Sequence, residues 1–216
     1  MGDEDFPRDD LEPPERDPNT GDMFGDAPGA APPMPTMDSA AYTVIARKYR
    51  PQTFDDLYGQ EAMVRTLRNA FSSGRIAHAF MLTGVRGVGK TTTARLLARA
   101  FNYETETVHA PTVDFREEGR NCRAIIEGRH IDVLELDAAT QTGVDNMRTL
   151  LESVRYGPIE GRYKVYIIDE VHMLSGSAFA SLLKTLEEPP PHAKFIFATT
   201  EIRKVPVTIQ IGRAHV

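Results

Sequence analysis

The feature that most constrains the fold of this sequence is a glycine-rich loop at residues 84–91, Gly-Val-Arg-Gly-Val-Gly-Lys-Thr. The loop matches the pattern G-x-x-x-x-G-K-[ST] in full, and it lies between an apolar run and a helix-like segment. Glycines let the backbone turn its N–H groups toward a phosphate, and the following helix N-terminus adds positive potential. Lys90 is expected to reach the β- and γ-phosphates of a nucleotide, and Thr91 to place its hydroxyl on Mg²⁺.

A second motif places two acids at the end of an apolar run, in Lys-Val-Tyr-Ile-Ile-Asp-Glu-Val-His at residues 164–172. Asp169 is expected to hold Mg²⁺ through water, and Glu170 to polarise the water that attacks the phosphate. Thr199 and Thr200 end the next apolar run, where a hydroxyl can sense the γ-phosphate. The plainer interpretation of the two threonines is that β-branched residues suit a strand.

Strand-like and helix-like hydrophobic patterns alternate along the chain. Short apolar runs are typical of buried parallel strands, and apolar residues at helical spacing indicate helices that cover the sheet. The alternation predicts an α/β fold with a parallel sheet flanked by helices on both faces. The predicted strands lie at 77–83, 131–136, 164–168 and 194–198, and the predicted helices at 59–73, 90–101, 143–155 and 175–187.

Residues 1–40 differ from the rest of the chain in charge and in proline content. They hold 11 of the 31 acids, 2 of the 25 Lys and Arg residues and 8 of the 15 prolines, and they lack periodicity. Ordering one residue costs about 1–2 kcal/mol, and this segment has too little apolar surface to offset that cost. We therefore predict a disordered, acidic, Pro-rich tail at 1–40, followed by a folded core.

Composition also excludes several classes of protein. No apolar run approaches the roughly 18 residues of a membrane span, so we expect no membrane association. Cys122 is the only cysteine, which excludes a disulfide framework. A single thiol without a secretory signal favours the cytoplasm.

Several stretches carry a family resemblance that covers about residues 43–209. They include Ala-Arg-Lys-Tyr-Arg-Pro-Gln-Thr-Phe-Asp-Asp-Leu at 46–57, Gly-Val-Arg-Gly-Val-Gly-Lys-Thr-Thr at 84–92, Val-Tyr-Ile-Ile-Asp-Glu-Val-His-Met-Leu-Ser at 165–175 and Leu-Leu-Lys-Thr-Leu-Glu-Glu-Pro-Pro at 182–190. These stretches resemble the gamma/tau subunits of bacterial DNA polymerase III, the AAA+ ATPases of the clamp loader. The resemblance implies a P-loop NTPase (AAA+) core at 41–210, with ATP and Mg²⁺ as ligands.

The resemblance also implies a role for each matching residue. Asp169 and Glu170 would serve Mg²⁺ and water, and Thr200 would be the sensor. Arg47 and Tyr49 lie in a basic segment that is similar to the family's adenine-side lip, although a basic connector is the alternative interpretation. The residues implied in triphosphate binding are Gly84, Val85, Arg86, Gly87, Val88, Gly89, Lys90, Thr91 and Thr92.

Members of this family use ATP to open the sliding clamp and to place it on primer-template DNA. The implied partners are other clamp-loader subunits in a homo- or hetero-oligomer, the sliding clamp, primer-template DNA and the replicative polymerase of the DNA-directed DNA polymerase holoenzyme. The implied location is the bacterial cytoplasm, in association with the nucleoid.

The sequence departs from the family pattern at three places. The usual four-cysteine zinc module is missing, because 102–123 contains only Cys122, so we predict no zinc. Gln141 stands where the family usually has a basic residue. The chain ends in Ile-Gly-Arg-Ala-His-Val at 211–216, which one frame of a common sequencing adapter also encodes. We therefore expect 211–216 to be non-native, and the arginine finger, the lid and the collar to be missing from a truncated product with weak ATPase activity.

Three other functions compete with this interpretation. Asp169-Glu170-Val171-His172 resembles the box of DExH helicases, which need a second motor domain. A small-molecule kinase would need an acceptor site and lid arginines that the sequence does not show. A third alternative is an AAA+ scaffold subunit that binds nucleotide without hydrolysing it, although such subunits typically lose the groups that Lys90, Thr91, Asp169 and Glu170 supply here.

Overall fold

The computed structural model describes residues 49–140, 144–210 and 214–215. The tail at 1–40, Arg47 and Gln141 therefore lie outside the described residues. The described elements are, in chain order, α2 (Glu61–Ser72), β1 (Ala79–Thr83), α3 (Lys90–Phe101), α4 (Cys122–Ile126), β2 (Val133–Asp137), α5 (Val144–Ser153), β3 (Lys164–Asp169), the 3-10 turn η1 (Val171–Met173), α6 (Gly176–Glu187), β4 (Ala193–Thr199), the 3-10 turn η2 (Ile202–Lys204), α7 (Val207–Gln210) and β5 (Ala214–His215).

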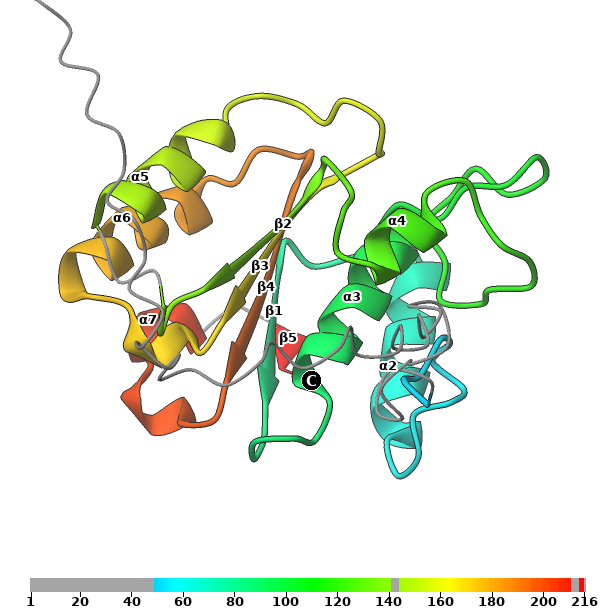
Figure 1. Cartoon of the computed structure of the whole chain (residues 1–216), viewed down its shortest axis with the longest axis horizontal. Helices are drawn as coiled ribbons and strands as arrows, with labels where there is room; N and C mark the ends of the chain where they lie inside the picture. The colour runs from blue at the N-terminus through cyan, green and yellow to red at the C-terminus, as the bar shows by residue number, and fades with distance from the viewer. Residues whose placement is uncertain (1–48, 141–143, 211–213, 216) are drawn as a thin grey trace, which may run out of the picture. The chain divides into compact units, whose positions relative to one another are not determined.

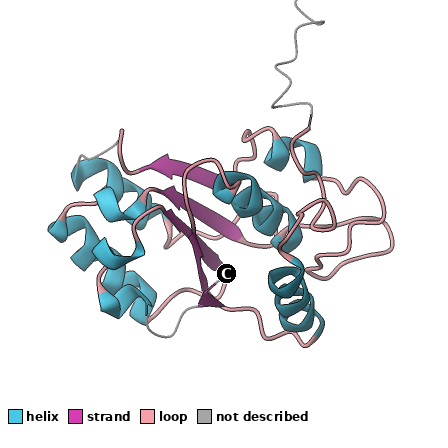
Figure 2. Ribbon diagram, turned by 90° about the horizontal axis from the view of Figure 1, so that it is seen from below, coloured by secondary structure: helices cyan, strands magenta, loops and turns pink. Residues whose placement is uncertain are grey.

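The strands form one sheet in the order β2-β3-β4-β1-β5, and all neighbouring pairs are parallel. Helices α5, α6 and α7 lie on one face of the sheet, and α2, α3 and α4 lie on the other (Figure 1). The view from below shows the same three layers (Figure 2). The structure thus confirms the predicted parallel sheet with helices on both faces.

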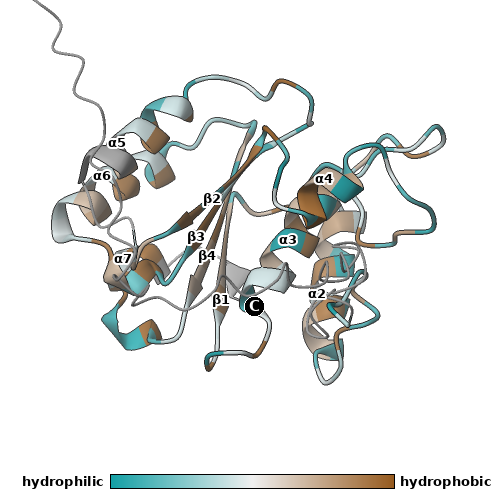
Figure 3. Cartoon of the chain, viewed as in Figure 1, coloured by the Kyte–Doolittle hydropathy of each residue, from teal (hydrophilic) through white to brown (hydrophobic). Residues whose placement is uncertain are grey.

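Alternation along the strands divides the apolar side chains between two cores. In β3, Tyr166 and Ile168 face the α5–α6 side, whereas Val165 and Ile167 face the α3 side. Successive side chains of a strand point to opposite faces, so a strand that is apolar throughout needs a cover on each face. In Figure 3 the central strands are brown over most of their length, while much of the surrounding loop surface is teal.

The predicted helices are present, and most of their boundaries differ from the predictions by one or two residues. The helix predicted at 90–101 begins and ends at those residues, because it follows directly from the glycine loop. Helix α6 begins after Ser175, whose hydroxyl accepts a hydrogen bond from the N–H of Ala178, as expected of an N-cap. The sequence analysis missed α4, α7 and β5, which have five residues or fewer.

The loop between α5 and β3 is held in place by a buried carboxylate directly before β2. Asp132 is 1% exposed, and its two oxygens accept hydrogen bonds of 2.7–2.8 Å from the N–H groups of Ile159, Glu160 and Gly161. Burial by itself raises the pKa of Asp132, but these N–H groups and nearby His130 outweigh it and hold the pKa below the usual 3.8.

We expect Asp132→Asn to lower the free energy of unfolding by about 2–3 kcal/mol at pH 7, because an amide NH₂ would face backbone N–H donors. Since the native pKa of Asp132 is lowered, its contribution is present in full above about pH 4 and is lost as the pH falls through the native pKa. The difference between the two proteins should therefore narrow in acid.

Urea unfolding at several pH values would measure this difference. Asp114→Asn is the matched control, because Asp114 pairs with Arg68 at 3.0 Å on the surface, where such pairs contribute less than about 1 kcal/mol. An equal loss in both variants would contradict the role of Asp132.

Candidate functional site

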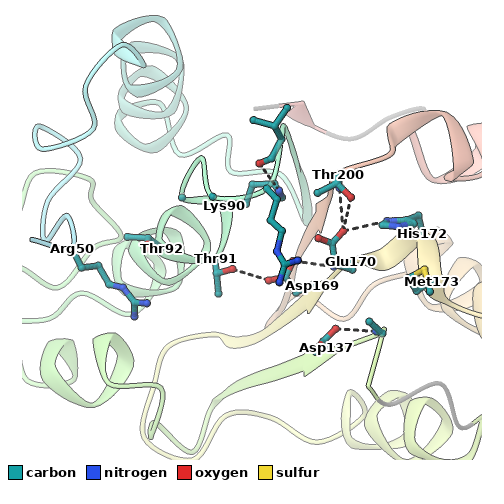
Figure 4. Close-up of a pocket in the computed structure, with 15 residues that line it drawn as sticks. Arg50, Lys90, Thr91, Thr92, Asp137, Asp169, Glu170, His172, Met173 and Thr200 are labelled. Carbon is teal, nitrogen blue, oxygen red and sulfur yellow. Dashed lines mark hydrogen bonds and ion pairs between the residues drawn. The ribbon is translucent and has the colours of Figure 1, made fainter. Parts of the chain in front are cut away.

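A pocket of about 860 Å³ opens at the carboxyl ends of the strands, where the loop after β1 meets the ends of β2, β3 and β4. Open α/β sheets bind ligands at this edge, beyond the carboxyl ends of their strands. Figure 4 shows the side chains that converge there. The lining residues are Arg50, Val85, Arg86, Gly87, Gly89, Lys90, Thr91, Thr92, Asp137, Ala139, Asp169, Glu170, His172, Met173 and Thr200.

The glycine loop curls over the N-terminus of α3. Gly87 and Gly89 have φ values of 86° and 100°, which residues with a Cβ rarely adopt, so glycine at both positions allows the turn. Lys90 is the first residue of α3, and its Nζ donates to the carbonyl oxygens of Gly84 at 2.9 Å and Val85 at 3.1 Å. The ammonium group thus lies inside the curl of the loop, where a phosphate would meet positive charge and the helix N-terminus together.

Thr91 and Asp169 join the phosphate loop to the end of β3. The Thr91 hydroxyl donates to Oδ2 of Asp169 at 2.7 Å (Figure 4). Mg²⁺ prefers oxygen ligands, and a hydroxyl and a carboxylate supply such oxygens. Thr91 and Asp169 both line the pocket that Lys90 also lines. These two residues therefore fit the predicted metal.

Glu170 turns the chain sharply after β3. Its φ of 47° and ψ of 45° lie in the left-handed region, and it is the only non-glycine residue with positive φ among the described residues. Its carboxylate Oε2 accepts hydrogen bonds from the hydroxyl of Thr200 at 3.0 Å and from the N–H of Thr200 at 3.2 Å. The structure thus brings the predicted base and the predicted sensor into direct contact.

Two acidic or basic groups of the pocket were missed by the sequence analysis. Asp137 ends β2 and lies opposite Asp169 in the strand register, so an apolar run that ends in an acid could have indicated it. His172 follows two residues after Glu170, and its Nδ1 lies 2.9 Å from Oγ1 of Thr199 and 3.3 Å from Oε2 of Glu170. The Asp-Glu-Val-His string contained this histidine, but only the fold brings it back to the end of β4.

Of the segment predicted to flank the adenine, the structure describes Tyr49 and Arg50. Tyr49 is 74% exposed and does not line the pocket, whereas its neighbour Arg50 does. Figure 4 shows Arg50 apart from the cluster around Lys90, on the far side of Thr92. Gly84 and Val88 belong to the loop without lining the pocket, and Gly84 contributes the carbonyl oxygen that holds Lys90.

The segment in which the family pattern has its zinc module is built from other contacts. Cys122 is buried, and its Sγ accepts a hydrogen bond from Nε of Arg99 at 3.0 Å. The ring of Phe115 lies 4.0 Å from the same guanidinium. Within the described residues, no group of three or more His, Cys, Asp or Glu residues is placed to hold a metal ion. In the same part of the chain, no helix is long and apolar enough to cross a membrane. The absence of zinc stays a prediction.

A family model described as "DNA polymerase III, delta subunit" matches residues 59–214. The chain is 54% identical over 171 residues to DNA polymerase III subunit tau of Salmonella typhimurium, an alignment that covers 78% of this chain and 26% of that protein. It is 49% identical over 168 residues to DNA polymerase III subunit gamma of Buchnera aphidicola, covering 78% of this chain and 45% of that protein. The chain thus spans between a quarter and a half of the length of these relatives.

Similarity to solved structures extends the comparison to the fold. A RuvB variant from Thermotoga maritima aligns with a TM-score of 0.50 at 17% identity, covering 77% of this chain and 47% of that chain. Together with the sheet order, this similarity confirms the predicted α/β fold, a parallel sheet flanked by helices.

We expect Thr91→Val, which removes one hydroxyl and keeps the shape of the side chain, to weaken the binding of ATP in the presence of Mg²⁺ by at least about tenfold. Without Mg²⁺ the affinity should change little, because the hydroxyl contacts Asp169 rather than the curl of the loop. Titration calorimetry with MgCl₂ and with EDTA measures both affinities. An equal loss under both conditions would show that Thr91 does not act through the metal.

Proposed function

This chain belongs to the DNA polymerase III subunit family whose model matches residues 59–214, and we propose that it is the ATP-binding and ATP-hydrolysing part of a gamma/tau-type clamp-loader subunit. The observation that carries the proposal is the convergence of Lys90, Thr91, Asp169, Glu170 and Thr200 on one pocket. A structural role alone would not require a buried lysine, two acids and two hydroxyls in a single open pocket.

In the proposed site, the chain's own groups bind the triphosphate and prepare the attack. The N–H groups of 84–92 bind the β- and γ-phosphates, and Lys90 exchanges its carbonyl contacts for phosphate oxygens. Thr91 and Asp169 hold Mg²⁺, which neutralises charge on the phosphates when bound. The adenine side would be lined by Arg47, Tyr49 and the neighbouring Arg50, of which Arg50 lines the pocket.

Glu170 is the group proposed to activate water. It accepts a proton from water as the water oxygen bonds to the γ-phosphorus, while the bond from the γ-phosphorus to the bridging oxygen breaks, giving ADP and phosphate. Thr200 lies within hydrogen-bond distance of the Glu170 carboxylate, so a change at the γ-phosphate can reach the end of β4 through it.

At the level of the whole protein, the proposed role is to load the sliding clamp onto primer-template DNA. The proposed partners are the other clamp-loader subunits, the sliding clamp, primer-template DNA and the replicative polymerase in the bacterial cytoplasm, near the nucleoid. The support is the 54% identity to a subunit named tau and the 49% identity to a subunit named gamma. Because the chain spans a part of these relatives, we expect weak hydrolysis by the chain alone and faster hydrolysis within the complex.

The strongest competing function is a subunit that binds nucleotide without hydrolysing it. Intact Asp169 and Glu170, with Glu170 held in a left-handed conformation beside Thr200, favour hydrolysis over this alternative. The match of a DNA polymerase III family model over 59–214 favours a clamp-loader subunit over a DExH helicase.

We expect Lys90→Ala to lose measurable Mg-ATP binding in titration calorimetry, since it removes the ammonium group that lies inside the curl of the phosphate loop. Lys184→Ala is the matched control, because Lys184 lies on the exposed surface of α6, outside the pocket. Circular dichroism should show that both variants fold. Unchanged binding by Lys90→Ala would contradict the proposed site.

We expect Glu170→Gln to keep the Mg-ATP affinity within about twofold and to lower the rate of a single turnover by about 10²–10⁴, the range typical of a general base. An excess of chain over radiolabelled ATP makes slow hydrolysis measurable. A Glu170→Gln variant that hydrolyses ATP as fast as the unmutated chain would rule out Glu170 as the base.

A further inference from the structure

One buried histidine contacts the proposed base from outside the phosphate loop. The side chain of His172 is 6% exposed and lies on η1, directly after the sharp turn at Glu170. Its Nδ1 is 2.9 Å from Oγ1 of Thr199 and 3.3 Å from Oε2 of Glu170. A dashed line in Figure 4 marks the contact between His172 and Glu170. Among the described residues, no hydrogen bond or ion pair joins this ring to the phosphate loop or to Asp169.

The position of the ring assigns its proton. Nδ1 has two oxygen neighbours, Oγ1 of Thr199 at 2.9 Å and Oε2 of Glu170 at 3.3 Å. A proton on Nδ1 keeps its lone pair from facing the carboxylate, so we infer that Nδ1 carries the proton and donates it to Oγ1 of Thr199, beside the carboxylate. On the other side of the ring, Nε2 lies 3.8 Å from Oε1 of Glu201, whose carboxylate is paired with Lys204 at 2.9 Å. Glu201 thus has a cationic partner of its own, and Glu170 is the carboxylate on the Nδ1 side of the ring.

The contacts of Glu170 are divided unequally between its two oxygens. Oε2 accepts hydrogen bonds from the N–H and from the hydroxyl of Thr200, and Nδ1 of His172 lies 3.3 Å from the same oxygen. No hydrogen bond or ion pair to Oε1 is present among the residues that the structure describes. A carboxylate held through one oxygen leaves the other free to accept a proton.

We propose that His172 is a positioning residue for Glu170: it anchors Oε2 together with Thr200, so that Oε1 is the oxygen presented to the attacking water. The inference rests on the proposed hydrolysis of ATP, and it adds a residue that touches neither the nucleotide-binding loop nor the metal-binding pair. Thr199 completes the arrangement, because its Oγ1 accepts the N–H of Glu201 at 3.0 Å and fixes the position that the ring contacts.

The test compares His172→Phe, which keeps a ring of similar size without a donor, with His172→Asn, which restores an N–H donor near Nδ1. We expect His172→Phe to slow a single turnover of Mg-ATP by about tenfold to a hundredfold, as a small misplacement of a catalytic group can, while the Mg-ATP affinity stays within about twofold. His172→Asn should recover most of the rate. His192→Phe is the control, because His192 contacts the carbonyl oxygen of Val154 at the other end of β4.

Three results would overturn the proposal. They are an unchanged rate in His172→Phe, a parallel loss of rate and affinity, and a rate in His172→Asn as low as that of His172→Phe. A long-range ¹H–¹⁵N spectrum of the unmutated chain gives a readout without turnover, and an Nε2–H tautomer would also overturn the proposal. An unmutated chain that fails to bind or to hydrolyse Mg-ATP would overturn the proposed function and this inference with it, whereas normal turnover combined with any of the other results overturns the inference alone.

Discussion

The hydrogen bond between Thr91 and Asp169 is the contact on which the geometry of the site depends. It is 2.7 Å long, and it ties the first turn of α3 to the end of β3, two elements that are 78 residues apart in the sequence. The N–H of Gly84 adds a second tie, to the carbonyl oxygen of Thr199 at 3.3 Å. Moving the phosphate loop away from the acids would break both hydrogen bonds.

The parallel register determines which groups can share the pocket. Thr83 pairs with Thr199 and Asp137 pairs with Asp169, so the strands on each side of the site end at the same level. The strands keep this register because both faces of the sheet are buried along the strands, between the two hydrophobic cores. The packing of residues such as Phe195 and Ile196 thus positions the polar groups at the end of the same strand, such as Thr199.

The sequence predicted the site better where a motif is local than where the fold assembles it. The phosphate loop and the Asp169–Glu170 pair are short strings whose local conformation follows from glycine positions and strand periodicity, and the structure brings them together. His172 and Asp137 could not be assigned in this way, because their roles depend on which strand ends are neighbours. In the segment predicted to flank the adenine, Arg50 lines the pocket and Tyr49 does not, and the role of the segment stays a prediction.

Secondary structure shows the same division. Long periodic segments such as α3 and α6 were predicted closely, whereas α4 and α7 have five and four residues and too few positions to show a period. The fold of 102–121 could not be predicted either, because it depends on tertiary contacts such as the guanidinium of Arg99 against Phe115 and Cys122.

The left-handed backbone at Glu170 has a consequence for which residues the position can accept. A non-glycine residue in this conformation costs on the order of 1 kcal/mol, and Gly, Asn and Asp adopt it most readily. Selection for stability alone would therefore replace the glutamate. In a related chain that does not need the carboxylate of Glu170, substitutions at this position should accumulate early. The residue found there therefore indicates whether the site still functions.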